Sequence, residues 1–281
     1  MLVPAPYWTS YTEMVKASGG VPVIIETTER EGVKIQARDL ENSINSKTKA
    51  IVLNSPSNPT GAVYTKEELQ AIADVILDTD LFVISDEIYE KLVYDDAKHV
   101  SIASLNPELV DRTIVVNGVP KSYAMTGWRI GYSAGPMDVL QGVANLQSQS
   151  TSNPCSIAQY AALAAITGEQ GFISKMVKAY DERRRFLHQH LNALSGVQCL
   201  EPKGAFYAFP RVSGFYGKSA GDVQITGSVS FADALLDQGH VATVPGAAFG
   251  SDDYIRLSYA TSLETLEEAI NRIEGFIKSI R

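Results

Sequence analysis

Cysteine is scarce in this sequence, and its scarcity excludes two classes of protein site. The 281 residues include only Cys155 and Cys199. Two cysteines without paired spacing provide neither a disulfide framework nor a zinc ligand set. We expect both thiols to be free and packed in the interior, as free cysteines usually are. The four histidines are scattered along the chain, and we assign them no metal site or other role.

Basic charge is also in short supply. Lysine and arginine number 24 against 32 aspartate and glutamate residues, which gives a formal net charge of -8. Nucleic acids and anionic membrane surfaces bind to basic faces, so this balance argues against both partners. No apolar run is long enough to span a bilayer, and the first residues lack a basic segment followed by an apolar core. A cytoplasmic location is therefore expected by default.

The first part of the chain alternates short apolar runs with helical patterns. Apolar residues make up 45 % of the sequence, which suffices for a sizeable core, and the length allows two domains. Such alternation indicates an α/β fold with a doubly wound, mostly parallel sheet. Strands are predicted at 21–25, 49–53, 81–85, 112–116 and 128–134, and helices at 37–44 and from Thr65, which forms a capping box with Glu68, to Leu77.

Helical patterns dominate the chain after Pro136. Thr261 and Glu264 are expected to cap a closing helix. The Arg183–Arg185 triplet is expected to lie on a solvated face, because acidic residues adjoin it. We expect a large domain at 1–170 and a small C-terminal α+β domain at 171–281. Helices are predicted at 136–148, 154–167 and 170–194, then strands near 197–200, 204–209, 241–244 and 254–259, with one helix ending at Gln238.

Three of the predicted strands end in clusters of polar residues. The first strand leads into Asn58, the second into Asp86 and Tyr89, and the third into Lys121. The carboxyl ends of parallel strands lie along one edge of a sheet, where open α/β sheets bind their ligands. The sequence therefore predicts that these side chains meet in one site.

Five longer motifs extend this set of residues. They are Pro-Tyr-Trp at 6–8, Ser-Pro-Ser-Asn-Pro-Thr-Gly at 55–61, Ser-Asp-Glu-Ile-Tyr at 85–89, Lys-Ser-Tyr-Ala-Met-Thr-Gly-Trp-Arg-Ile-Gly-Tyr at 121–132 and Arg-Leu-Ser-Tyr-Ala-Thr-Ser at 256–262. In this order, the sequence resembles the class I aminotransferases, the fold-type I enzymes that use pyridoxal 5'-phosphate. One motif alone is weak evidence. Together they are most similar to the prokaryotic-type aspartate aminotransferases, including the branch that also aminates prephenate.

The resemblance implies that the large domain binds the cofactor and that Lys121 forms its Schiff base. Among side chains, only a lysine amine condenses with the cofactor aldehyde and later exchanges it for a substrate amine. By resemblance, Lys121 is also the base that moves the substrate proton. Asp86 is implied beside the ring nitrogen of the cofactor, where a carboxylate keeps that nitrogen protonated. Glu87 points to the other side of the strand end and is expected to be structural.

The matched motifs imply the remaining site residues. Tyr89 and Asn58 match the hydrogen-bonding partners of the cofactor phenolic oxygen, and Arg129 matches the arginine that pairs with the cofactor phosphate. Trp8 corresponds to the aromatic side chain that stacks on the cofactor ring and lines the substrate pocket. Arg256 matches the arginine that binds the substrate α-carboxylate. Trp8, Asn58 and Arg256 thus form the implied substrate-binding set.

The resemblance also implies a reaction, and it leaves alternatives open. The expected activity is amino transfer between an amino acid, aspartate, and a 2-oxo acid, 2-oxoglutarate, by a homodimer. The alternatives are a prephenate or aromatic aminotransferase, an enzyme that uses the same cofactor for β-elimination or decarboxylation, and a truncated, inactive homologue with only a pairing role. Relatives carry roughly a hundred residues before the Pro-Tyr-Trp loop, including a helix N-terminus that cradles the cofactor phosphate, so we expect an N-terminally truncated chain.

Overall fold

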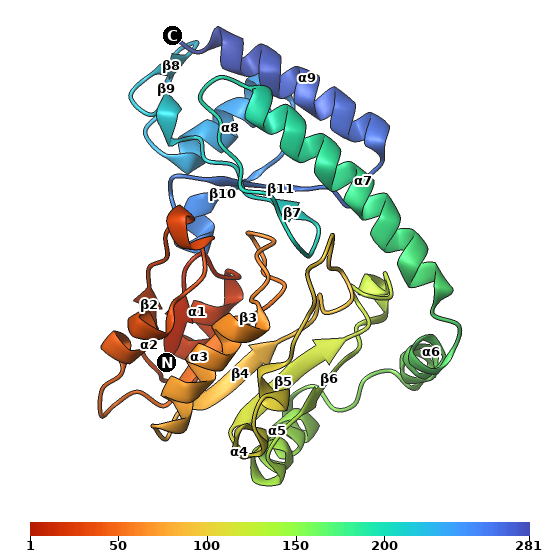
Figure 1. Ribbon diagram of the computed structural model, residues 1–281. Helices are drawn as coiled ribbons and strands as arrows, with labels where there is room; N and C mark the ends of the chain where they lie inside the picture. The colour runs from red at the N-terminus through yellow and green to blue at the C-terminus, as the bar shows by residue number, and fades with distance from the viewer.

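The apolar runs of the first half form the six-stranded sheet in the lower part of Figure 1. The computed structural model describes all residues from Met1 to Arg281. The strand order is β2-β1-β3-β4-β5-β6, and all neighbouring strands are parallel except β5 and β6. This arrangement confirms the predicted α/β fold with a mostly parallel sheet. The strands are β1 (Leu2–Pro4), β2 (Val23–Ile25), β3 (Ala50–Asn54), β4 (Phe82–Asp86), β5 (Thr113–Gly118) and β6 (Gly131–Ala134).

Side chains along β3 alternate between the two faces of the sheet, as expected for a strand. Ile51 and Leu53 belong to the core that is shared with α2, α3 and α4, whereas Val52 packs with α1 on the other face. The Glu68 carboxylate accepts the Thr65 backbone N–H at 2.8 Å, and the Thr65 hydroxyl accepts the Glu68 N–H at 3.2 Å. This geometry confirms the predicted capping box at the start of α3. The helices are α1 (Ser10–Ala17), α2 (Ala37–Ser43), α3 (Lys66–Leu77) and α4 (Pro107–Val110), with 3-10 turns η1 (Glu29–Glu31), η2 (Ile102–Ser104) and η3 (Thr126–Trp128).

A second, smaller sheet and three helices form the upper part of Figure 1. The antiparallel order is β10-β11-β7, and a separate pair joins β8 to β9. The long helix α7 leads into this part from below, and α9 packs along it. The elements are α7 (Gly171–Ala193), β7 (Tyr207–Ala208), η4 (Ser213–Phe215), β8 (Ser219–Ala220), β9 (Val223–Gln224), α8 (Ser228–Gly239), β10 (Val244–Pro245), η5 (Gly246–Phe249), β11 (Ile255–Ser258) and α9 (Leu263–Ser279).

Two separate hydrophobic cores accompany the two sheets. One core draws its residues from Leu2 to Leu109, and the other consists of Tyr94 together with residues from Leu187 to Phe276. This separation supports the proposal that residues 1–170 and 171–281 form two domains, with α7 joining them.

Two local predictions in the second part are wrong. Helix α9 is capped by Ser262, whose hydroxyl accepts the Thr265 N–H at 3.2 Å, and not by Thr261 with Glu264. Thr261 and Ser262 both carry a hydroxyl and both precede the helical pattern, so the sequence leaves the start of the helix ambiguous by one residue. The predicted strand near 197–200 is reduced to one bridge between Gln198 and Arg211.

Two further side chains differ from the prediction in their solvent exposure. Arg184 is only 1 % exposed, because Asp95, Asp181 and Glu201 surround its guanidinium at 3.0, 2.5 and 2.9 Å. A buried guanidinium is tolerated when carboxylates pair with it in this way. The prediction of a solvated arginine triplet is therefore wrong for its middle member. Cys155 is exposed at the start of a helix, and only Cys199 is buried as predicted.

Helices α5 (Met137–Ser150) and α6 (Ser156–Thr167) keep much of their apolar surface exposed. No residue of α5 is buried, and all four residues of the edge strand β6 are exposed. Large exposed apolar side chains that gather on a surface often mark an interaction site. We call these exposed side chains the α5–α6 patch: Met137, Val143, Leu146, Ile157, Tyr160, Leu163 and Ile166.

Candidate active site

The ends of β3, β4 and β5 bring the predicted polar residues to one edge of the large sheet. The register aligns Asn54 with Asp86 and Asp86 with Val116, so these three strands end in one row. Asn58 follows the first of these strands, and Lys121 follows the third. The expected meeting of these segments at one sheet edge is thus observed.

Lys121 lies at the centre of the charged groups. Burial and the nearby positive charges of Arg256 and Arg129 lower the pKa of its amine, and the negative charge of Asp86 acts in the opposite direction. Its Nζ lies 5.7 Å from the centre of the Tyr89 ring. A lower pKa leaves more of the amine neutral, and only a neutral amine attacks a carbonyl carbon. Four of the predicted site residues therefore lie close enough to act on the proposed nucleophile.

Asp86 is held by a residue that the sequence did not reveal. The Tyr11 hydroxyl donates to Asp86 Oδ2 at 2.5 Å, and the Ile88 N–H donates to Oδ1 at 3.2 Å. Burial raises the pKa of Asp86, whereas these two hydrogen bonds favour its ionised form. Burial also raises the pKa of Tyr11 well above its ordinary value, so this phenol remains a donor.

Trp8 continues this chain of contacts on one face of the sheet. Its ring meets the Tyr11 ring edge to face, with centroids 5.4 Å apart. Both rings and Asp86 line a cavity of about 790 Å³, which also reaches Met14 and Val116. Lys121 does not line this cavity. Trp8 and Asp86 therefore line one cavity, whereas Lys121, which follows the end of β5, lies outside it.

Arg256 has a guanidinium without a carboxylate partner. Its Nη1 donates to Asn58 Oδ1 at 2.8 Å. Its Cζ atom lies 4.5 Å from the centre of the Tyr207 ring and 4.9 Å from that of Phe249. Burial lowers the pKa of this guanidinium, and none of the chain's carboxylates offsets that effect. A half-buried cation without a carboxylate partner is suited to bind an incoming anion.

Tyr89 also has a partner that the sequence did not reveal. Its hydroxyl lies 2.9 Å from the hydroxyl of Tyr207, which is 118 residues away in β7. Burial, followed by the influence of Tyr207, raises the pKa of Tyr89. The phenol therefore stays protonated and available as a hydrogen-bond donor. No local pattern around Tyr207 predicts this contact, because it depends on how the two sheets pack.

Arg129 is the most exposed of the predicted residues. Its backbone is left-handed, with φ at 56°, and its Nη1 donates to the Thr126 carbonyl at 3.1 Å. An arginine seldom adopts this backbone conformation, which costs about 1–3 kcal/mol and is often found at functional sites. Its charge still acts on Lys121. The guanidinium is thus near the amine and is not paired with any carboxylate.

Two glycines allow the Asn58 loop to contact the second part of the chain. Gly61 has φ at +70°, and a Cβ atom there would lie 2.5 Å from the Pro202 Cβ. A Cβ atom on Gly204 would lie 2.5 Å from the Pro56 Cβ. The backbones approach closely because neither position has a side chain. This contact keeps Asn58 within reach of Arg256.

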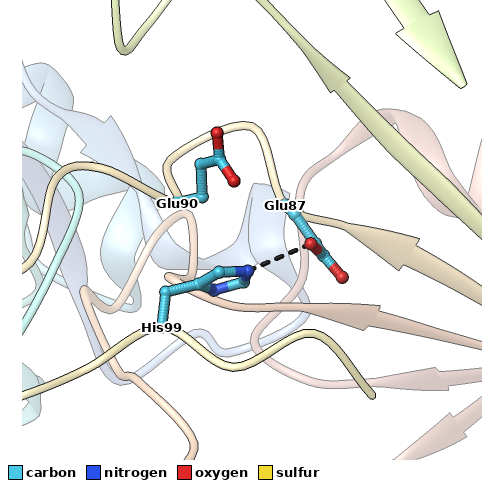
Figure 2. Close-up of side chains that lie close together, drawn as sticks. All are labelled: Glu87, Glu90 and His99. Carbon is cyan, nitrogen blue, oxygen red and sulfur yellow. Dashed lines mark hydrogen bonds and ion pairs between the residues drawn. The ribbon is translucent and has the colours of Figure 1, made fainter. Parts of the chain in front are cut away.

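The end of β4 is supported by the cluster in Figure 2, which includes Glu87, the residue that follows Asp86. Ser85 and Ser101 donate to Glu87 Oε1 at 2.9 and 2.6 Å, and His99 Nε2 lies 3.0 Å from Oε2. Burial alone would raise the pKa of Glu87, but the bonds from His99 and Ser101 lower it. One carboxylate oxygen each from Glu87 and Glu90 and one ring nitrogen of His99 lie within 4.8 Å of one another. Glu87 is already saturated with partners, as expected for a structural residue.

These residues fit pyridoxal phosphate in several respects. The site contains a partly buried amine, a carboxylate fixed in one orientation, a protonated phenol and an unpaired guanidinium. Ser122, next to Lys121, is buried, and its hydroxyl has no hydrogen-bond partner in the chain. A buried hydroxyl without a partner marks a place where a polar group can bind.

Comparisons with known proteins agree with this geometry. The family model described as aminotransferase class I and II matches residues 1–273. An aspartate aminotransferase of Bacillus sp. (strain YM-2) is 49 % identical over 278 residues, which are 99 % of this chain and 70 % of that protein. An aspartate/prephenate aminotransferase of Cereibacter sphaeroides is 48 % identical over 98 % of this chain and 70 % of its own length. The crystal structure of the aspartate aminotransferase from Rhizobium meliloti superposes with a TM-score of 0.96 at 41 % identity, covering 100 % of this chain and 70 % of that one.

The chain belongs to the class I and II aminotransferases. Within that family it is a pyridoxal-phosphate-dependent transaminase similar to the aspartate and aspartate/prephenate aminotransferases. No helix in the structure combines the length and apolar character that a membrane span requires.

Proposed function

We propose that this transaminase moves an amino group from aspartate to 2-oxoglutarate, with Lys121 as the residue that attaches the cofactor. The observation that supports this proposal most strongly is the position of Arg256. Its unpaired guanidinium and Lys121 are close enough for the charge of one to lower the pKa of the other. A substrate carboxylate on Arg256 would thus place the substrate amine beside the reacting lysine. Relatives named aspartate aminotransferases support the choice of substrate.

Each residue has a proposed part in holding the cofactor. When bound, pyridoxal phosphate withdraws electrons from the substrate α-carbon and so makes its proton removable. Asp86 would keep a proton on the ring nitrogen, and Tyr11 orients Asp86 for this contact. Asn58 uses its Oδ1 to accept from Arg256, which leaves its amide N–H groups free to donate to the cofactor phenolic oxygen together with Tyr89.

Other residues would orient the phosphate and the substrate. Arg129 would pair with the phosphate, for which its planar set of donors is suited. Trp8 would cover the cofactor ring from the side of the Tyr11–Asp86 contact. Arg256 would bind the α-carboxylate through two parallel hydrogen bonds. The Lys121 Nζ would hold and move the proton of the substrate α-carbon.

The substrate proposal is tested by measuring transamination with aspartate and 2-oxoglutarate in the wild type and in Arg256→Lys. Lysine keeps the charge but loses the planar pair of donors, so we expect KM for aspartate to rise about tenfold to a hundredfold. Arg185→Lys, at an exposed arginine on α7, is the matched control and should leave KM unchanged. An equal KM in Arg256→Lys and the wild type would exclude Arg256 as the carboxylate site. A wild type without transaminase activity would favour the inactive alternative.

Prephenate is the second candidate amino acceptor. The aspartate/prephenate aminotransferases of Cereibacter sphaeroides and Nitrosomonas europaea are 48 % and 44 % identical to this chain. Prephenate and 2-oxoglutarate both carry a 2-oxo-acid carboxylate, and Arg256 would bind either one. Competition between the two acceptors in one assay distinguishes them, because the preferred acceptor has the higher kcat/KM.

We propose further that the enzyme is a homodimer. The α5–α6 patch supports this state, because residues such as Leu146 and Tyr160 are 73 % and 74 % exposed. Sedimentation of the wild type should then show a particle of two chains. Leu146→Glu should shift it toward one chain, whereas Val110→Glu, at an exposed apolar residue on α4, should not. A wild type that sediments as one chain at all concentrations would exclude the dimer.

A further inference from the structure

Tyr207 lies where the two parts of the chain meet. Its strand β7 belongs to the small sheet and pairs with β11, which carries Arg256. Its hydroxyl crosses to Tyr89, which follows strand β4 of the large sheet. The side chain is buried. Tyr207 therefore touches one residue on each side of the site.

The two contacts use different parts of the side chain. The ring supports the Arg256 guanidinium, whose Cζ lies 4.5 Å from the ring centre. The hydroxyl lies 2.9 Å from the Tyr89 hydroxyl, and Tyr89 has no other side-chain hydrogen bond in the structure. The ring contact attracts a cation, and the hydroxyl contact fixes a phenol. One substitution can therefore remove the hydroxyl contact alone, and a second can remove both contacts.

The hydroxyl pair also has a preferred direction. Under the proposed function, Tyr89 donates its proton to the phenolic oxygen of the cofactor. The Tyr89 oxygen is then left as an acceptor, so Tyr207 must be the donor of the pair. A hydroxyl that accepts one hydrogen bond and donates another is polarised, so the hydrogen bond that it donates is stronger. The chain thus runs from Tyr207 to Tyr89 and from Tyr89 to the cofactor.

We propose that Tyr207 is a positioning residue with two functions: its hydroxyl directs the Tyr89 phenol toward the cofactor, and its ring holds Arg256 for the substrate carboxylate. This inference rests on the proposed function. It extends that function by connecting cofactor binding in the large sheet with substrate binding in the small sheet through one side chain. The family motifs in the sequence do not include this residue.

The test compares Tyr207→Phe with Tyr207→Leu. Phenylalanine keeps the ring and removes the hydroxyl. We expect it to weaken pyridoxal phosphate binding about fivefold and to shift the absorption band of the bound cofactor, with KM for aspartate within about twofold of the wild type. Leucine also removes the ring, so KM for aspartate should be on the order of tenfold higher in Tyr207→Leu than in Tyr207→Phe. Tyr216→Phe is the control, because its hydroxyl bonds only the Asp252 carbonyl.

Each outcome separates this inference from the proposed function. A wild type that neither binds pyridoxal phosphate nor transaminates would refute the proposed function itself. An active wild type with Tyr207→Phe showing the same absorption band and cofactor affinity would refute the hydroxyl function. Equal KM values in Tyr207→Phe and Tyr207→Leu would refute the ring function. Circular dichroism melting of each variant identifies loss of folding. Succinate is a dicarboxylate without an amino group, so its binding, measured by calorimetry, tests the Arg256 site without turnover.

Discussion

The contact between Tyr11 and Asp86 allows a sharp prediction about cofactor binding. The Tyr11→Phe substitution removes one hydroxyl and keeps the ring against Trp8. A hydrogen bond to a charged group contributes about 1.5–3 kcal/mol, and the 2.5 Å distance places this bond among the short ones. Under the proposed function, Asp86 must be ionised to hold a proton on the cofactor ring nitrogen. We therefore expect pyridoxal phosphate affinity to fall by roughly one to two orders of magnitude.

The sign of the pH effect follows from the same bond. Tyr11 stabilises the ionised carboxylate, so its loss raises the pKa of Asp86 further than burial already does. As the pH falls, the variant should lose the cofactor at a higher pH than the wild type. The assay is cofactor titration followed by absorbance over a pH series. The Tyr11→Phe substitution should have no further effect in an Asp86→Asn background, because its target charge is gone. Additive losses in the double variant, or identical pH curves for single variant and wild type, would refute this reasoning.

Three further predictions concern stability and are checked by urea unfolding. Arg184→Met should cost about 1.5–3 kcal/mol, because it removes a buried guanidinium and its hydrogen bonds to three carboxylates that keep other cations nearby. Arg185→Ala, at an exposed arginine, should cost under about 1 kcal/mol, and equal losses would contradict the importance of burial. Gly204→Ala should destabilise the protein because its Cβ would clash with Pro56, while Gly275→Ala on α9 has open space and should stabilise by up to about 1 kcal/mol. The pKa of Glu87 is lowered from its ordinary value of 4.5, so its ionised form stabilises the fold at pH values above 4.5, and this contribution is lost as the pH falls below 4.5. Glu87→Gln should therefore be less stable than the wild type near neutral pH and should approach it in acid.

The sheet and its strand ends were predictable because they depend on local patterns. A short apolar run such as Ile51 to Leu53 is typical of a strand that is buried on both faces. Parallel strands of this kind end at one edge, so the positions of Asn58, Asp86 and Lys121 after their strands predict a shared location. The capping box at Thr65 is likewise a local pattern. Its structure depends on neighbours within one helical turn.

Contacts between distant segments were not predictable from local patterns. Tyr11 meets Asp86 across 75 residues, and Tyr89 meets Tyr207 across 118. A tyrosine that donates a buried hydrogen bond looks the same in sequence as one that only fills space. Arg184 shows the same difficulty, because acidic neighbours such as Asp181 are equally typical of a solvated helix face. Its burial depends on carboxylates that other segments supply.

The most direct test of the central claim is to locate the cofactor on the chain. The purified protein is mixed with pyridoxal phosphate, reduced with borohydride, digested, and examined by mass spectrometry. One phosphopyridoxyl group per chain should be found on the peptide that contains Lys121, and Lys121→Ala should carry none. Labelling that is absent from the wild type, or that is spread over other lysines and unchanged in Lys121→Ala, would contradict the assignment of this site.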